Sequence, residues 1–245
     1  MLIDELKNIA RNNGIVGAGG AGFPAYAKMT EKADTVILNC VECEPLLKLH
    51  RQLLATHTEE IIQMLDEVRE SFGAKEAVIG IKSEYVTTIK AIEEVIGDFP
   101  NVRICALKAA YPMGDEVVLI YEATGRVIKP GGLPIDENVV VYNVETMYNL
   151  YRAVHLNIPV TNKLVSIVGE IDHPLTVRVP LGTTVKEAIS LAGKITVEDP
   201  AYVMGGPMMG RLGTENTVIT KTTNAILVLP KDHLIVAKKQ RTSSI

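Results

Sequence analysis

The sequence predicts an α/β protein in which a larger domain built on a parallel sheet precedes a smaller domain richer in β-strands. Through about residue 160, short apolar runs alternate with stretches of helical spacing, a rhythm that implies parallel strands joined by right-handed crossovers. Beyond Pro159 the sequence changes to β-branched runs separated by turns. We therefore expect a first domain over residues 1–160, a second over 161–237, and a disordered tail over 238–245.

The composition is that of an ordinary globular protein and narrows the range of partners. Hydrophobic side chains make up 47% and charged side chains 22% of the 245 residues. The net charge of −4 argues against a nucleic-acid groove and against binding to an anionic membrane surface. The sequence shows no signal-peptide pattern and no apolar run approaching about 18 residues, so we expect neither secretion nor a membrane span. The cytoplasm is the default location.

The elements of the first domain follow from apolar spacing and from glycine stops. Apolar residues at helical spacing up to Phe72, with Gly73 as a natural stop, predict a helix. Buried runs such as Thr35–Asn39 predict strands. In chain order we expect a helix over 4–12, a strand over 35–39, a helix over 59–72, a strand over 76–81, a helix over 85–96, a strand over 102–107, a helix over 117–123, a strand over 139–146 that turns polar at its end, and a helix over 147–155.

A glycine-rich run from Gly14 to Lys28 precedes the first strand. Its glycines at positions 17, 19, 20 and 22 remove β-carbons from one side of a tight turn. Backbone N–H groups can therefore approach an anion there, and a helix can start against the turn. Lys28 adds a mobile positive charge, and Phe23-Pro24 adds an apolar plate. We interpret the run as a phosphate cradle; the alternative is a packing turn that binds nothing.

Three later loops carry polar side chains directly after strands, where α/β sheets bind ligands. They are Asn39, Glu42 and Glu44 in the first loop, Asp115 and Glu116 in the second, and Asn143, Glu145 and Thr146 in the third. The adjacent acids of the second loop would repel a phosphate, which leaves ribose hydroxyls, a flavin ring edge or a nicotinamide amide as partners. The alternative for the second loop is that its acids only complement the helix dipole, and the alternative for the third is that its side chains only cap a helix.

The cysteines and histidines form no recognisable catalytic or metal site. Cys40 and Cys43 make a C-x-x-C pair, but a four-thiolate site needs another pair, and Cys105 is the only other thiol. We expect no metal, and we expect Cys43 to be a packed thiol, with a redox relay as the alternative. The five histidines are scattered, and we expect them at the surface or at helix caps; they occupy positions 50, 57, 155, 173 and 233. No catalytic side chain is predicted.

The second domain begins with a hairpin pattern and continues into a helix. Thr184 and Glu187 form a capping box for this helix, and Gly193 ends it. Two strands, a helix and a later strand are typical of a β-grasp fold. In chain order we expect strands over 163–169 and 175–179, a helix over 185–192, a glycine-rich turn over 202–210 with packed methionines, and a last strand over 225–229.

Four motifs resemble the flavin-binding domain shared by the NADH-oxidising flavoprotein of respiratory complex I, the C subunit of the Rnf electron-transport complex, and the cobalamin reductase of propanediol utilisation. They are GAGGAGFPAYAK, NCVECEP, AYPMGDEV and YNVETMYN, in this order over about the first 160 residues. The resemblance implies a Rossmann-like flavin domain. The β-grasp part resembles the soluble-ligand-binding (SLBB-type) domain that follows it in these proteins. The short stretch before the glycine run, YPMGDE and the later GGPMMG are most similar to the cobalamin reductase.

The resemblance implies a site for FMN and NADH made from all four motifs. Its residues would be Gly17, Gly19, Gly20, Gly22 and Lys28 from the first, Asn39, Glu42 and Glu44 from the second, Tyr111, Gly114, Asp115 and Glu116 from the third, and Asn143 and Thr146 from the fourth. The first motif would hold the phosphate end of FMN, and the fourth would close the site near the ribityl chain and phosphate. The second would lie beside the flavin, with Glu44 approaching NADH, and the third would form the opposite wall.

Three positions depart from the family pattern. Ala18 stands where the complex I flavoprotein has arginine, Ala25 where threonine is common, and Tyr142 where asparagine is common. Loss of the arginine removes a positive charge near the phosphate. We therefore expect FMN to be held weakly.

The function implied by the resemblance is electron transfer from NADH through FMN towards iron–sulfur clusters, most similar to cobalamin (corrinoid) reductase. One alternative is a fragment of an Rnf-type C subunit, although these subunits usually carry an extra domain before the glycine run. An alternative of another class is a non-catalytic scaffold that binds a corrinoid or a partner protein. The β-grasp domain is equally compatible with a ligand-binding, structural or docking role.

Relatives continue into paired C-x-x-C-x-x-C-x-x-x-C-P runs that hold iron–sulfur clusters, and no such run is present here. We therefore expect the chain to be a truncated piece of a longer protein, with its clusters in the absent region. The expected partners are NADH and a corrinoid or redox partner protein, with no nucleic acid. Homo-oligomerisation stays open, as does a location inside a bacterial microcompartment or at the inner face of a membrane complex.

Overall fold

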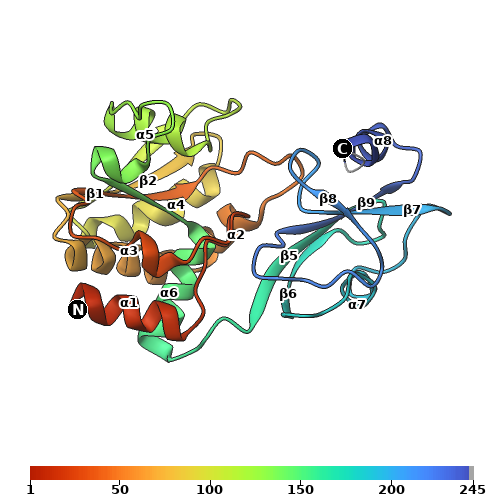
Figure 1. The fold of residues 1–245 in the computed structure, drawn as a ribbon, viewed down its shortest axis with the longest axis horizontal. Helices are drawn as coiled ribbons and strands as arrows, with labels where there is room; N and C mark the ends of the chain where they lie inside the picture. Colours follow the sequence, from red (N-terminus) through yellow and green to blue (C-terminus); the bar gives the residue numbers. More distant parts are fainter. Residues whose placement is uncertain (243–245) are drawn as a thin grey trace. The chain divides into compact units, whose positions relative to one another are not determined.

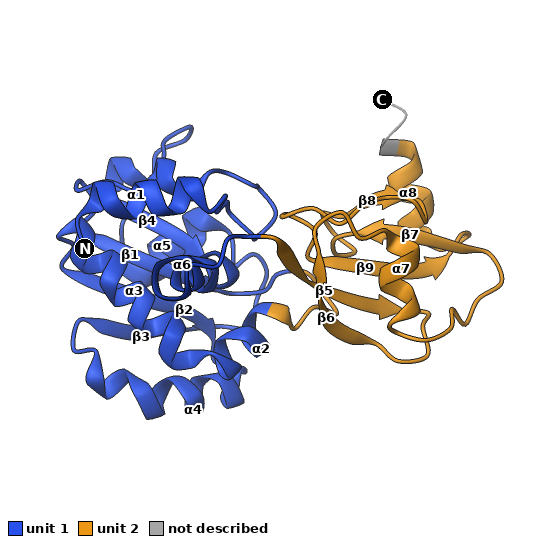
Figure 2. Ribbon diagram, turned by 90° about the horizontal axis from the view of Figure 1, so that it is seen from below, with its two compact units in different colours: residues 1–43, 50–160 blue, residues 44–49, 161–245 orange. Residues whose placement is uncertain are grey.

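The computed structural model describes residues 1–242, and its chain folds into two compact units (Figures 1 and 2). The first unit contains residues 1–43 and 50–160, and the second contains residues 44–49 together with the chain from Thr161 onward. The short segment 44–49 was not expected in the second unit. It belongs there because both carboxylate oxygens of Glu44 accept hydrogen bonds from that unit's backbone.

The first unit is built on four parallel strands in the order β3-β2-β1-β4. The strands are β1 (Thr35–Cys40), β2 (Glu76–Lys82), β3 (Val102–Leu107) and β4 (Val139–Asn143). Near-continuous burial of β1, β2 and β4 matches their apolar sequences, as expected for a parallel sheet covered on both faces. The predicted parallel α/β class is confirmed.

Helices cover both faces of this sheet. In Figure 1, α5 lies on one side and α1, α3 and α6 lie on the other. The helices are α1 (Ile3–Asn12), α2 (Leu49–Thr56), α3 (Thr58–Phe72), α4 (Val86–Val95), α5 (Glu116–Thr124) and α6 (Val144–Leu156), with short 3₁₀ helices η1 (Ala25–Lys28), η2 (Ile96–Asp98) and η3 (Pro134–Glu137). Helix α2 was not predicted. The predicted strand over 139–146 is too long, because Asn143 already caps α6.

The second unit has a mixed sheet in the order β6-β5-β9-β7-β8. Its strands are β5 (Asn162–Gly169), β6 (Leu175–Pro180), β7 (Pro200–Met204), β8 (Arg211–Gly213) and β9 (Ala225–Pro230). Strand β5 pairs antiparallel with β6 and parallel with β9, and α7 (Val185–Ser190) begins at the predicted Thr184–Glu187 capping box. The predicted β-grasp domain is confirmed.

The chain beyond Lys238 is not a disordered tail in the described residues. Helix α8 (Leu234–Thr242) runs through it, which corrects the expectation for 238–242, whereas residues 243–245 lie outside the described part. Val236 is buried with Val203 and Leu227, and Lys239 Nζ donates hydrogen bonds to the backbone of residues 208 and 210. A buried apolar contact and a polar anchor therefore hold a helix whose sequence alone is mostly polar.

Candidate functional site

The strand order of the first unit points to one place on the sheet. From β1 the chain proceeds through β2 to β3 on one side, and β4 returns to pair with the other side of β1. The loops that follow β1 and β4 therefore diverge from neighbouring strands. In open α/β sheets, ligands bind outside the carboxyl ends of the strands at such a switch point.

The glycine loop, residues 17–22, is a hairpin-like turn and not the start of an α-helix. Val16 pairs with Pro24 in an isolated bridge, the Gly17 N–H donates to Phe23 O at 2.7 Å, and the Gly22 N–H donates to Gly17 O at 3.1 Å. Only the short 3₁₀ helix η1 follows. The expected helix start is thus wrong, and any anion would be met by amides of the loop itself. Gly20, with φ of 126°, adopts a conformation that side chains disfavour.

Three consecutive amides of the glycine loop are open to solvent. Gly19, Gly20 and Ala21 are exposed, and within residues 1–242 their N–H groups have no hydrogen-bond acceptor. The neighbouring Ala18 N–H donates instead to Thr146 Oγ1 at 2.9 Å, which pins the loop to the first turn of α6. Thr146 therefore orients the loop, and successive unpaired amides in a turn are a common anion-binding device.

Asn143 lies at the end of β4, directly against the glycine loop. Its Oδ1 accepts the Glu145 N–H at 2.9 Å and so caps α6. A β-carbon on Gly19 would lie 3.4 Å from Asn143 Nδ2. The same Nδ2 lies 3.4 Å from each ring nitrogen of His50.

The Lys28–Glu116 ion pair joins the first and third motifs. Lys28 Nζ donates to Glu116 Oε1 at 3.2 Å and to the carbonyl oxygen of Val141 at 3.3 Å. The neighbouring acid, Asp115, is exposed and caps α5 by accepting the N–H groups of Val117 and Val118. The two adjacent carboxylates therefore have different partners.

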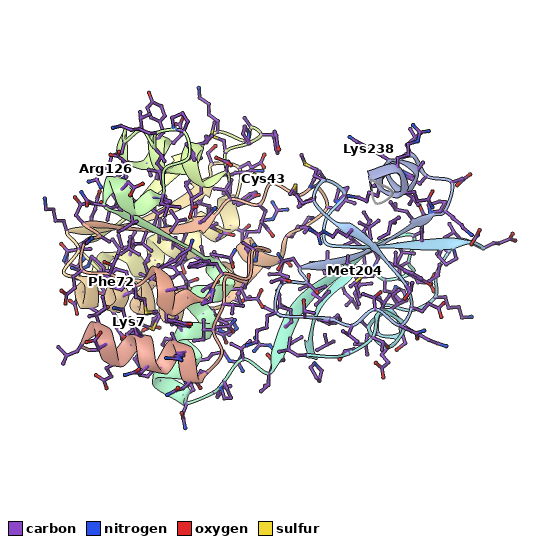
Figure 3. The ribbon with its side chains drawn as sticks, in the orientation of Figure 1. Lys7, Cys43, Phe72, Arg126, Met204 and Lys238 are labelled. Carbon is purple, nitrogen blue, oxygen red and sulfur yellow. The ribbon has the colours of Figure 1, made fainter. Side chains whose placement is uncertain are left out.

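The second and third motifs are locked together around Gly114. Asn39 Nδ2 donates to Gly114 O at 3.0 Å, while Asn39 Oδ1 accepts the Val41 N–H at 2.9 Å. The Gly114 N–H donates to Cys43 Sγ at 3.2 Å; Cys43 is labelled in Figure 3. Tyr111, in the same loop, is 68% exposed. Both polar groups of the Asn39 side chain are thus used to hold these loops in place.

Glu42 caps a helix that the sequence did not predict. Its buried carboxylate accepts the backbone N–H groups of His50 at 3.0 Å and Arg51 at 3.5 Å, at the start of α2. This cap brings the His50 ring to Asn143, a contact that the sequence did not predict. The sequence holds only a weak signal for this cap, namely an acid several residues before a short apolar stretch. Lys82 Nζ donates to the backbone carbonyl of Glu42 at 2.8 Å.

Burial controls the ionisation of two neighbouring side chains. Burial raises the pKa of Tyr85 to about 12; the Glu42 charge adds to this rise, and Arg51 opposes it. Burial also holds the pKa of the Cys40 thiol well above its ordinary value, again with a contribution from Glu42. All three cysteines are free thiols, and no cluster in residues 1–242 has the side chains to hold a metal ion.

Glu44 belongs to the second unit and takes no part in the contacts described above. Its carboxylate accepts the N–H of Met208 at 2.8 Å and that of Met209 at 2.6 Å, and a β-carbon on Gly206 would collide with it. The glycine-rich turn after β7 is thus a nest for this carboxylate. That Glu44 approaches NADH stays a prediction.

Together, the parallel sheet, the glycine loop and the polar loops at the switch point define a cofactor-binding α/β domain followed by a β-grasp domain. Residues 10–152 match the model of the Nuo51 FMN-binding domain, and residues 164–212 match the SLBB domain. The chain therefore belongs to the Nuo51 FMN-binding family, as the four motifs indicated.

Individual relatives cover nearly all of this chain. The cobalamin reductase PduS of Citrobacter freundii is 40% identical over 96% of this chain and 52% of its own length. The C subunit of the Na+-translocating ferredoxin:NAD+ oxidoreductase complex of Acetobacterium woodii is 32% identical over 96% of this chain and 54% of its own length. The chain thus spans about half the length of these relatives.

A solved structure shares the fold. The crystal structure of an NAD+-reducing NiFe-hydrogenase in the H2-reduced state superposes with a TM-score of 0.75 at 21% identity, covering 94% of this chain and 47% of that one. In the described part of the chain, no helix has the length and apolar character needed to cross a membrane.

Proposed function

We propose that this chain binds FMN at the carboxyl edge of its parallel sheet and passes electrons from NADH through that FMN, as part of a cobalamin (corrinoid) reductase. The observation that carries the proposal is the set of three unpaired amides, Gly19 to Ala21, held at the switch point by Thr146. Membership of the FMN-binding family supports the choice of cofactor.

The chemistry of the loop fits a phosphate ester. The unpaired amides offer donors without side chains in the way, and Lys28 offers a positive charge. That charge is already paired with Glu116, and Ala18 adds none. We therefore expect the amides to supply most of the affinity and FMN to be released readily.

The remaining site residues would orient the cofactor and its partner. Asn143 would lie near the ribityl chain, and the loops locked by Asn39 and Gly114 would form the walls beside the ring. When bound, FMN supplies hydride acceptance from NADH and release of single electrons. The role of this chain would be to fix the positions of FMN and NADH and to exclude competing reactions. No side chain is assigned a proton transfer.

A corrinoid is the acceptor we favour, because the relative named cobalamin reductase is 40% identical and the ferredoxin:NAD+ oxidoreductase subunit is 32% identical. The name of the ferredoxin:NAD+ oxidoreductase subunit supports a nicotinamide dinucleotide as electron donor. Onward transfer would use iron–sulfur clusters outside this sequence and a redox partner protein. Three free thiols suit a reducing compartment such as the cytoplasm.

The test is a titration of the purified chain with FMN, followed by anaerobic addition of NADH or NADPH. Quenching of flavin fluorescence measures binding, and loss of the oxidised-flavin absorption band measures reduction. Binding and bleaching by NADH support the proposal. Absence of FMN binding at high concentration contradicts it and favours the non-catalytic scaffold.

A Lys28→Ala substitution should weaken FMN binding by about tenfold or more, because a hydrogen bond to a charged group contributes about 1.5–3 kcal/mol and 1.4 kcal/mol is tenfold. It also leaves Glu116 unpaired and repulsive. The double variant Lys28→Met/Glu116→Gln separates the two effects. Lys7→Ala, which removes a lysine paired with Asp4 on α1, is the matched control. Equal FMN affinity in Lys28→Ala and the control would count against the cradle.

A further inference from the structure

We propose that His50 is a positioning residue for FMN binding: the face of its ring packs against the Asn143 side chain and so fixes the amide that lies against Gly19 of the glycine loop. The inference rests on the proposed function. It adds a residue from α2, a helix outside all four sequence motifs.

The hydrogen bond of Asn143 Oδ1 decides which end of the Asn143 amide faces His50. Its Oδ1 accepts the Glu145 N–H at 2.9 Å, so its Nδ2 is the group left to donate outward. Nδ2 lies 3.4 Å from both Nδ1 and Nε2 of His50. An amide nitrogen equally far from both ring nitrogens lies over the face of the imidazole and not along the lone pair of either nitrogen, so the ring holds the amide by stacking against it.

The His50 ring is held in place from its own side as well. Its backbone N–H donates to Glu42 Oε1 at 3.0 Å, and its Nδ1 lies 4.0 Å from the same oxygen. The side chain is only 12% exposed. Glu42 is in turn fixed at the start of α2 by Arg51, whose Nε lies 3.8 Å from Oε2. The ring thus has little freedom to leave Asn143.

The Asn143 amide connects His50 to the glycine loop. It caps α6, the helix whose Thr146 holds the Ala18 N–H, and it lies against Gly19. Removing the imidazole takes away the ring face that supports the amide and leaves a vacated space beside it. The amide can then rotate, and the Gly19 backbone loses its support.

The experiment measures FMN dissociation constants for His50→Ala, His50→Phe, Asn143→Ala and the double variant His50→Ala/Asn143→Ala. We expect His50→Ala to weaken FMN about three- to tenfold, the range of one aromatic ring contact. His50→Phe should recover most of the affinity, because its ring offers Asn143 a flat face in the same place. The double variant should bind as Asn143→Ala does, since the two residues act through one contact.

A second readout needs no cofactor. In the apo protein, side-chain amide resonances of Asn143 and the backbone amide of Gly19 should shift in His50→Ala, which lacks the ring, and return towards wild type in His50→Phe. His155→Ala is the control, because His155 pairs with Glu67 on the surface of α3 and α6. Thermal melts verify that each variant is folded.

The outcomes separate the inference from the proposed function. If wild type binds FMN and His50→Ala binds equally well, the inference is wrong and the function stands. Equal weakening by alanine and phenylalanine, or additive effects in the double variant, also overturns it, because the ring face would then not be what holds Asn143. Failure of wild type to bind FMN overturns both.

Discussion

At the scale of single residues, the site depends on positions where two backbone segments approach too closely to leave room for a side chain. Gly114 is the clearest case: a β-carbon there would lie 2.5 Å from Val41 O and 2.7 Å from Cys43 Sγ. Its N–H donates to Cys43 in the loop after β1, and its carbonyl accepts from Asn39 near the end of β1. Glycine at this position is required by close approach of two loops, not by an unusual φ angle.

A Gly114→Ala substitution should therefore destabilise the first unit by about 1–3 kcal/mol, the usual range for forcing an extra carbon into a packed site. The midpoint of thermal unfolding measures this. FMN affinity should fall as well, because the loops after β1 and β3 must separate.

Gly97→Ala is the matched control, because a β-carbon at Gly97 meets nothing within 4 Å and its φ is not left-handed. Its melting midpoint should stay close to wild type. Equal midpoints for the two variants would contradict the tight packing of Gly114.

At the scale of elements, three of the four helices that begin at the carboxyl edge are capped by a residue of a site motif, and α4 is the exception. Asp115 caps α5, Asn143 caps α6, and Glu42 binds the first amides of α2. The sequence permitted the first two roles, because these residues directly precede helical patterns. It did not predict α2, because Glu42 lies several residues before the helix and because Leu49, Leu53 and Leu54 form too short a pattern.

The capping role of Asp115 gives a test at this scale. Asp115→Ala should cost about 0.5–2 kcal/mol of stability through loss of the α5 cap, whereas Asp115→Asn should retain most of it, because asparagine caps equally well. FMN affinity should be unchanged in Asp115→Asn. A large loss of FMN binding in that variant, with stability intact, would show that the carboxylate contacts the ligand instead.

At the scale of the whole chain, local patterns were enough to predict both folds but not the division between them. Strand and helix periodicities depend on near neighbours, and both architectures followed from them. The assignment of residues 44–49 to the second unit depends on Glu44 meeting amides more than a hundred positions away, at Met208 and Met209. Helix α8 likewise depends on packing against β7 and β9. Contacts of this range leave no pattern in the sequence.

The opposite end of the first sheet is closed by an ion pair that no motif marks. Arg126, labelled in Figure 3, donates to both carboxylate oxygens of Asp34 at 2.6 and 3.1 Å and to Glu137 O at 2.8 Å. The Asp34 backbone also bonds to Lys75 and Asn138. These contacts tie together the segments that precede β1, β2 and β4, at the amino ends of the strands.

Stability of the first unit should therefore depend on pH through Asp34. Burial raises the pKa of this carboxyl, but hydrogen bonds from Arg126 and Thr35 and the charges of Arg126 and Lys75 outweigh it, so its pKa lies below the ordinary value of 3.8. A group with a lowered folded pKa stabilises the protein above its unfolded pKa, and this contribution is lost as the pH falls through the folded value. Asp34→Asn should thus be less stable than wild type at neutral pH, and the difference should shrink below pH 3.8.

Denaturant unfolding at a series of pH values measures this difference, with Asp4→Asn as a control because the Asp4 side chain is 87% exposed. FMN affinity at neutral pH should be the same in both variants, because Asp34 lies at the amino ends of the strands and the proposed site lies at their carboxyl ends. A stability gap between wild type and Asp34→Asn that is constant with pH would mean that the lost carboxylate matters only through its shape and packing. An altered FMN affinity would mean that the two ends of the sheet are coupled.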